Sequence, residues 1–146
     1  MSVLALVALT AATLFTGAAA YISLVEHPAR MGLDDRALLT QWKPSYDRAL
    51  PIQSGLAIVG GVAGIASWYF THDWLWVAGS VALLANWPYT LLAIMPTNRQ
   101  LKAIPPQDAG PQSRALLVKW GSLHDVRSIL GATASLLFAA ASVRGL

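Results

Sequence analysis

The sequence contains no cysteine among its 146 residues. Without cysteine the protein has no disulfide framework, zinc–thiolate site, thiol nucleophile or cysteine-ligated iron–sulfur cluster. It also lacks a glycine-rich phosphate loop and a nucleotide-binding fingerprint, and no serine stands in a context that favours Ser/His/Asp catalysis. Several classes of enzyme are therefore excluded.

Charged residues are also scarce. They make up 12% of the chain, about half the usual share of ~25%. The net charge is +3, but the basic residues are spread through several segments and form no single basic face or tail. We therefore expect no nucleic-acid partner and interpret the charge as a signal of membrane topology.

The hydrophobic residues, 55% of the chain, are gathered into four long runs. Each run approaches the ~20 apolar residues that a helix needs to cross a hydrocarbon core of ~30 Å. The sequence therefore predicts a single all-α domain over residues 1–146, an integral membrane four-helix bundle in contact with membrane lipid. The expected spans cover residues 3–25, 51–70, 74–95 and 123–143.

The first run could also be a cleaved signal peptide, because Ala18-Ala19-Ala20 resembles a cleavage site. However, Met1-Ser2-Val3 provides no basic n-region, and the apolar run is long for a signal peptide. We interpret it as a membrane helix.

The connection over residues 26–50 predicts a short interfacial helix. Asp34 or Asp35 would cap this helix, and Pro44 would end it. Its apolar side chains would lie together at the membrane interface, and they are Leu38, Leu39 and Trp42.

The other two connections differ in length. Thr71-His72-Asp73 alone joins the second and third spans, and its aromatic flanks predict a tight hairpin within an aromatic belt. The third connection contains Pro105-Pro106 and therefore begins as an irregular loop. A helical pattern resumes over residues 112–120, so the fourth helix is expected to start outside the membrane.

Four crossings put both termini and the hairpin on one face of the membrane and the two longer connections on the other. On the terminal face the basic residue is Arg144. The two longer connections carry eight basic side chains: Arg30, Arg36, Lys43, Arg48, Arg99, Lys102, Arg114 and Lys119. The positive-inside rule then predicts that the longer connections face the cytoplasm and that both termini lie on the opposite side.

Small residues suggest close helix packing. Gly60 and Gly64 form a G-x-x-x-G pair, and Gly131 with Ser135 repeats the spacing. These pairs could pack helices within one chain, or they could join two chains in a homo-oligomer.

Polar side chains near the longer connections are the candidates for function, because polar groups at membrane depth are costly unless they face a bundle interior or water. Three spans contribute them, and the last three lie at i, i+4 and i+7, on one helix face. The candidates are Glu26, His27, Asn86, Asn98, Trp120, His124 and Arg127.

Structural roles remain open for several of these residues. Glu26 and His27 could anchor the helix at the interface, with Arg127 reaching toward the surface and paired to Glu26. Asn86 could make an interhelical hydrogen bond or cap backbone loosened by Pro88. A metal could be ligated by Glu26, His27 and His124, and the two histidines could hold a haem, but no within-helix ligand spacing supports either site.

Four sequence elements carry a family resemblance that covers nearly the whole chain: His27-Pro28, Asn86, Thr97-Asn98-Arg99-Gln100-Leu101, and the segment from Trp120 to Arg127. Together they resemble the anthrone oxygenase-like family of small four-helix membrane proteins, long catalogued mainly as a domain of unknown function. The last element, W-x-x-x-[H/N]-x-x-R, is the most specific.

The resemblance implies an oxygenase that oxidises an apolar anthrone-like or phenol-like aromatic with O₂. Base-catalysed formation of a carbanion could allow this reaction without a cofactor, and His27, with Glu26 nearby, would be the base. Polar groups would stabilise the developing oxyanion or peroxide, and these are Asn86, Asn98 and Arg127, with His124 as a hydrogen-bonding partner. The expected aromatic contacts to the substrate are Trp87, Tyr89 and Trp120.

Two other functions remain open. The polar cluster could hold a lipid headgroup or a quinone in a non-enzymatic or assembly subunit of a membrane complex. Alternatively, the chain could be a metal- or haem-binding membrane redox protein.

Overall fold

The computed structural model describes residues 2–145, which form four long helical rods. The first rod comprises α1 (Val3–Tyr21), the π-helical turn η1 (Ile22–Glu26) and α2 (His27–Met31), and the second is α3 (Asp35–Thr71). The third comprises α4 (Trp74–Leu84), α5 (Asn86–Tyr89), the π-helical turn η2 (Thr90–Ile94) and α6 (Met95–Ala103). The short 3₁₀ helix η3 (Pro106–Asp108) precedes the fourth rod, α7 (Pro111–Arg144).

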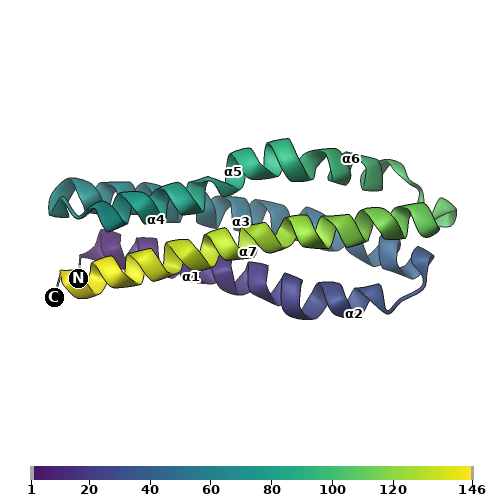
Figure 1. Ribbon diagram of the computed structural model, residues 1–146, viewed down its shortest axis with the longest axis horizontal. Coiled ribbons are helices and arrows are strands. Elements are labelled where there is room, and N and C mark those ends of the chain that lie inside the picture. The colour runs from purple at the N-terminus through teal and green to yellow at the C-terminus, as the bar shows by residue number, and fades with distance from the viewer. Residues whose placement is uncertain (1, 146) are drawn as a thin grey trace.

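The rods run up and down in chain order. The termini lie together at one end of the bundle, and the two longer connections lie at the other end (Figure 1). Helices α1 and α4 each pack against both α3 and α7. All four rods are long and apolar enough to cross a membrane. The predicted all-α membrane four-helix bundle is therefore confirmed.

The helix ends follow the local sequence signals. Asp34 accepts a hydrogen bond from the backbone N–H of Ala37 and caps α3, and Asp73 caps α4 by accepting one from Leu75. His72 has a left-handed backbone with φ of 57° at the end of α3. The hairpin is thus as tight as the sequence predicted.

The separate interfacial helix before Pro44 is not observed. Helix α3 continues through Pro44 and Pro51, and Leu38, Leu39 and Trp42 are fully buried rather than lying at the membrane interface. Each proline removes one backbone donor. Side chains at i, i+4, i+7 and i+11 face the core across both prolines: Trp42 and Gln53 are buried, and Tyr46 and Ala49 are partly buried.

Both π-helical turns stand directly before a proline. The backbone N–H of His27, before Pro28, donates to Ile22, and that of Met95, before Pro96, donates to Thr90. A proline ring lacks the N–H for an i→i−4 bond and presses on that carbonyl, so one widened turn relieves the conflict. The two turns set the rotation of α2 and α6.

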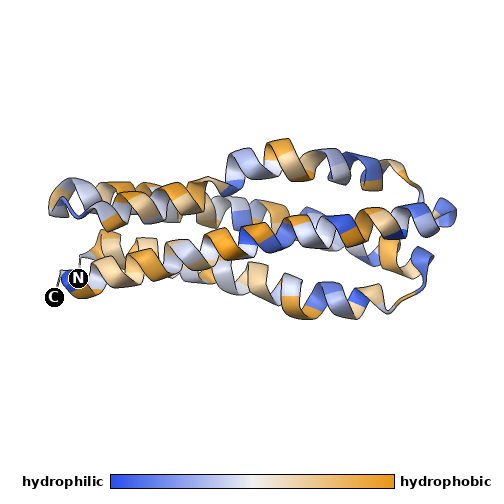
Figure 2. Ribbon diagram, in the orientation of Figure 1, coloured by the Kyte–Doolittle hydropathy of each residue, from blue (hydrophilic) through white to orange (hydrophobic). Residues whose placement is uncertain are grey.

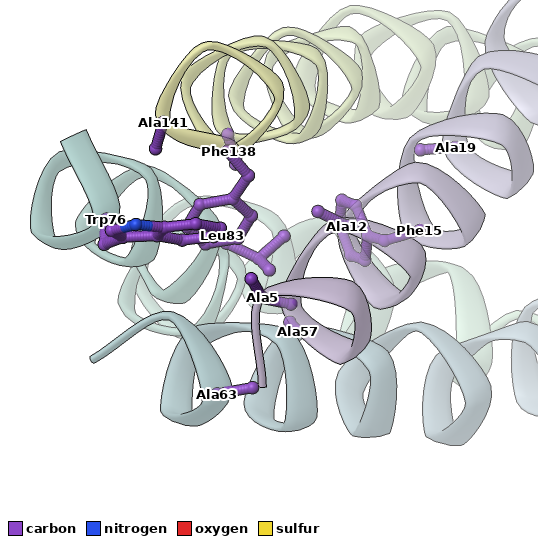
Figure 3. Close-up of a cluster of buried hydrophobic side chains, with 12 residues drawn as sticks. Ala5, Ala12, Phe15, Ala19, Ala57, Ala63, Trp76, Leu83, Phe138 and Ala141 are labelled. Carbon is purple, nitrogen blue, oxygen red and sulfur yellow. The ribbon is translucent and has the colours of Figure 1, made fainter. Parts of the chain in front are cut away.

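Glycines allow close packing near the termini. Any Cβ atom at Gly64 would lie 2.3 Å from the Ser80 hydroxyl, and one at Gly79 would lie 2.5 Å from the Phe138 ring. Phe138 stands beside Trp76 and Leu83 in this cluster (Figure 3). Gly60 likewise abuts Leu83, so both members of the Gly60/Gly64 pair contact neighbours of the same chain.

Candidate functional site

The buried polar residues lie between two apolar clusters. One cluster, toward the termini, includes Ala57, Leu83 and Ala134, and the other, toward the longer connections, includes Trp42 and Trp120. Hydrophilic residues mark the middle of α7 and the connections away from the termini (Figure 2). The buried polar side chains of this region include His27, Arg30, Gln53, Asn86, Asn98, His124 and Arg127.

Trp120 is the centre of the aromatic contacts. Its indole stacks on the His124 imidazole at 4.9 Å between ring centroids and tilts against His27 at 5.2 Å. Trp42 meets it edge-on at 5.9 Å, and the Arg30 guanidinium lies over the same ring at 5.9 Å. Trp120 therefore joins α2, α3 and α7 within one cluster.

His124 is held by a pair of hydroxyl groups. Its Nδ1 lies 3.1 Å from the Ser23 hydroxyl, which lies 3.0 Å from that of Ser128. When Ser23 donates to Ser128, it accepts from Nδ1–H of His124 and leaves Nε2 as the basic nitrogen. This arrangement gives His124 a defined orientation beside Arg127.

Glu26 has a different partner from the one expected. Its carboxylate forms an ion pair with Arg30, one helical turn later, and accepts hydrogen bonds from Ser45 at 2.5 Å and Gln41 at 3.1 Å. The expected anchoring pair between Glu26 and Arg127 is therefore wrong. The π-helical turn directs Glu26 and Arg30 toward α3, where α3 supplies the other donors.

Arg127 is buried in the bundle and does not reach toward the surface. Only 6% of the residue is exposed, and its guanidinium lies over the Phe15 ring at 5.6 Å. Within residues 2–145 no carboxylate pairs with it, and its Nε has no hydrogen-bond acceptor. A buried cation without a counter-charge is costly, so an anionic group beside Arg127 would lower that cost.

The two asparagines each keep a free acceptor. Asn86 donates from Nδ2 to the Leu83 carbonyl at 3.0 Å, where α4 gives way to α5, and Asn98 donates to the Tyr46 hydroxyl at 2.9 Å. The Oδ1 atoms of both have no partner within the described chain. Asn86 thus bonds to backbone at the junction of α4 and α5 and keeps a buried oxygen without a partner.

Arg127 lines two cavities. A small cavity of about 20 Å³ lies among the aromatic cluster and is lined by Tyr46, Gln53, Trp120, His124 and Arg127. A larger one of about 110 Å³, which we name the lateral chamber, lies between α3 and the α5–η2 segment. Its wall is mostly apolar, and its lining residues include Leu50, Ser54, Asn86, Trp87, Leu91 and Arg127.

The predicted site residues therefore divide between locations. Asn86, Trp87 and Arg127 line the lateral chamber, and Trp120 and His124 line the small cavity. His27 lies on the other side of Trp120, in a groove between α2 and α7. Tyr89 donates its hydroxyl to the Leu123 carbonyl at 3.1 Å and is used to join two helices.

Sequence analysis missed three central residues. Arg30 was counted among the connection charges although its position relative to Glu26 is i+4, the spacing of a helical ion pair. Tyr46 was hidden by the assumption that a helix ends at Pro44, and Gln53 was not considered although it lies within the expected span 51–70. The i, i+4, i+7, i+11 spacing from Trp42 to Gln53 was the signal that could have found them.

The donor set does not suit a metal. Glu26 already has three partners on Arg30, Gln41 and Ser45, and His27 and His124 contact Trp120. No group of three or more histidine, aspartate or glutamate side chains among residues 2–145 is arranged to hold a metal ion.

Two comparisons with known proteins point to the same family. The profile of the anthrone oxygenase family matches residues 42–137. The chain is 30% identical over 138 residues to a protein named anthrone oxygenase from Claviceps purpurea (strain 20.1), and the match covers 85% of this chain and 79% of that protein. No solved structure matches the chain. The chain belongs to the anthrone oxygenase family.

Proposed function

We propose that this protein is a membrane-embedded oxygenase that converts an anthrone-like aromatic into the corresponding quinone with O₂. The observation that carries the proposal is Arg127, a buried guanidinium without a carboxylate partner in the described chain, beside the imidazole of His124 and an apolar chamber. A relative named anthrone oxygenase gives independent support.

The reaction requires a base and a stabilised anion. Removal of one proton from the methylene group gives a carbanion whose charge is shared with the ketone oxygen. One electron passes to O₂, and the two radicals combine to form a carbon–oxygen bond and, after protonation, a hydroperoxide. Loss of the second methylene proton breaks the O–O bond and releases water. The sum is CH₂ plus O₂ giving C=O plus H₂O.

Arg127 would stabilise the enolate oxygen. In a site that excludes water, a positioned donor strengthens as charge develops, and removal of one such donor typically costs about 10²–10³ in kcat. Asn86 and Asn98 each donate one Nδ2 hydrogen, to the Leu83 carbonyl and the Tyr46 hydroxyl respectively, and the second Nδ2 hydrogen of each would add a hydrogen bond to the anion. Trp120 would provide an aromatic wall to the small cavity.

The base is one of two imidazoles. His124 lines the same cavity as Arg127 and has a free Nε2 when Ser23 accepts from Nδ1. His27, the base expected from the sequence, has an unpaired buried Nδ1 but lies across Trp120, and Glu26 is engaged with Arg30. Because the family motif admits asparagine at position 124, we propose His27 as the proton acceptor and His124 as its rival.

The test is O₂ consumption and quinone absorption with anthrone as the substrate and purified protein in lipid nanodiscs. We expect one O₂ per quinone, a loss of at least about 100-fold in Arg127→Leu, and a larger loss in His27→Ala than in His124→Asn. The reverse order of the histidine variants would identify His124 as the base. Full turnover in Arg127→Leu, or in both histidine variants, would contradict the mechanism.

We also propose that the reaction needs no cofactor, because a stabilised carbanion can itself reduce O₂. Metal analysis and an absorption spectrum of active protein test this point directly. A stoichiometric metal or a haem band would instead support the redox-protein alternative, and co-purified lipid or quinone without turnover on an aromatic panel would support a non-enzymatic binding subunit.

We propose a membrane orientation in which the two longer connections face the cytoplasm. Both connections lie at one end of the bundle and carry most of its exposed basic residues, although Arg30 belongs to the buried cluster. Because the chain has no cysteine, a single cysteine at Lys119 can be labelled with a membrane-impermeant maleimide. Labelling from outside intact cells would contradict this orientation.

A further inference from the structure

The lateral chamber has an outer rim on the side of the bundle. Trp87 and Leu91 line it and are 40% and 54% exposed, respectively. Both belong to segments within a membrane-spanning rod, and an exposed apolar side chain at that depth faces lipid. The chamber therefore opens between α3 and the α5–η2 segment toward the hydrocarbon region.

The inner end of the chamber is polar. Arg127 of α7 lines the chamber, and its buried Nε has no acceptor. Asn86 lies nearby on the wall, with Nδ2 bound to Leu83 and Oδ1 unpaired. One buried positive charge and one unpaired acceptor thus stand beside a mostly apolar space, whose wall also includes Ser54 and Thr90.

We propose that the lateral chamber binds a flat hydroxylated aromatic that arrives through the bilayer and is held as its phenolate or enolate anion by Arg127. The apolar walls accept the rings, the guanidinium supplies the counter-charge, and the Oδ1 of Asn86 accepts a hydrogen bond from a remaining hydroxyl group. This inference rests on the proposed function and specifies where, and in which ionic form, the substrate binds.

The anionic form follows from the electrostatics of the chamber. Water would stabilise Arg127 in solution, but the chamber wall provides no carboxylate among the described residues. An ionised ligand oxygen supplies the missing charge and a strong hydrogen-bond acceptor together. A neutral flat aromatic of the same size fills the same volume but leaves the guanidinium unpaired.

Binding can be tested without turnover. The probe is 2-hydroxyanthraquinone, which has no methylene group to oxidise and whose phenolate absorbs at a longer wavelength than the phenol. Unsubstituted 9,10-anthraquinone is the matched ligand that cannot ionise. In phosphatidylcholine nanodiscs, we expect the wild-type protein to produce the phenolate band at a pH where empty nanodiscs leave the probe neutral, and to bind the probe at least tenfold more tightly than anthraquinone.

Two variants locate the site. Ser54→Phe fills the chamber from α3, whereas Ile52→Phe adds the same ring at a side chain that is 62% exposed on the same helix. We expect Ser54→Phe to raise the Kd of the probe at least tenfold and Ile52→Phe to leave it unchanged. Arg127→Leu should abolish the phenolate band, and Arg127→Lys should restore part of it. An unchanged Kd in Ser54→Phe, or an intact band in Arg127→Leu, would overturn the proposal.

A separate measurement tests whether the chamber opens toward lipid. Leu91 lines the chamber, whereas its neighbour Leu92, 79% exposed, does not. Since the chain has no cysteine, Leu91→Cys and Leu92→Cys can each carry one nitroxide spin label. Collisions with O₂ should exceed those with a water-soluble nickel chelate at both labels, and the probe should reduce O₂ access only at position 91. Dominant nickel collisions at position 91 would overturn the lipid-facing opening.

These results separate this inference from the oxygenase proposal. If the probe binds as an anion in the chamber but no aromatic is oxidised, the binding site stands and the oxygenase function fails. If oxidation occurs but Ser54→Phe binds the probe normally, the oxygenase function stands and this chamber is not its binding site.

Discussion

The imidazole of His27 lies against the backbone of Gly121, so closely that a Cβ atom at position 121 would stand 2.6 Å from its Nε2. The contact joins α2 to α7 one residue after Trp120, whose ring also touches His27. Glycine is therefore needed at position 121 because the His27 side chain of α2 lies where a Cβ atom would be. The backbone angles of Gly121 do not themselves require glycine.

Gly121→Ala should displace the His27 ring and disturb the aromatic cluster. Overpacking of this kind costs about 1–3 kcal/mol, and we expect a lower thermal midpoint in detergent. Gly55→Ala is the matched control, because no atom lies within 4 Å of a Cβ at that exposed helical position. Equal midpoints for the two variants would show that His27 does not depend on Gly121.

Glu26→Gln should destabilise the protein by leaving Arg30 unpaired. The Arg30 side chain is 3% exposed and that of Glu26 is 23% exposed. Breaking a fully buried pair costs about 3–5 kcal/mol, so about 1–3 kcal/mol is expected for this partly screened one. Denaturant unfolding measures the change, and Arg30→Met in the Glu26→Gln background should recover part of it.

The exposed pair between Lys102 and Asp47 provides the control. Their side chains are 37% and 55% exposed, and such surface pairs contribute about 0–1 kcal/mol. Asp47→Asn should therefore change the unfolding free energy by less than Glu26→Gln does. A larger effect at Asp47 would refute the assignment of the buried pair as the structural one.

Tyr46→Phe should loosen Asn98. The Tyr46 hydroxyl accepts the amide hydrogen of Asn98 at 2.9 Å, and the Oδ1 of Asn98 already has no partner in the described chain. Removal of this acceptor leaves a buried amide unsatisfied, at a cost of about 1–3 kcal/mol. The stacking of ring 46 on Trp42 at 5.1 Å is retained. Unfolding measurements check the stability, and anthrone turnover should fall if Asn98 contacts the anion.

Gly64→Ala should press on Phe138 and Ser80, which would lie within 2.8 Å of the added methyl group. We expect a loss of about 1–3 kcal/mol from overpacking, without a change in oligomeric state. In Gly17→Ala the methyl group meets no atom within 4 Å, and its stability should match the wild type. A wild-type dimer that becomes a monomer in Gly64→Ala by light scattering would instead favour a homo-oligomer through this face.

The membrane fold was predictable because hydrophobic length is a local property. Four apolar runs, the caps at Asp34 and Asp73, and the short hairpin each depend on neighbouring residues alone. The prediction that a helix ends at Pro44 was wrong because helix continuation there depends on contacts with other helices and not on neighbouring residues alone. A proline costs one hydrogen bond, and packing of Trp42 and Gln53 on either side of it outweighs that cost.

The polar residues of the site could be identified from the sequence, since polar side chains within apolar spans are uncommon. The partners of these side chains could not be predicted from the sequence. Glu26 could have paired with Arg30 or Arg127, and the π-helical turn before Pro28 together with the donors on α3 selects Arg30.

The sequence by itself determined that this chain is a four-helix membrane protein with polar residues gathered toward one end, because apolar length and local spacing suffice for that. Only the tertiary structure decided that Arg127 is left without a carboxylate partner in the described chain, that His27 and His124 contact the same indole, and that a chamber opens between α3 and α5. Those features depend on helix rotation, which is set by π-helical turns and by side chains that meet across the bundle.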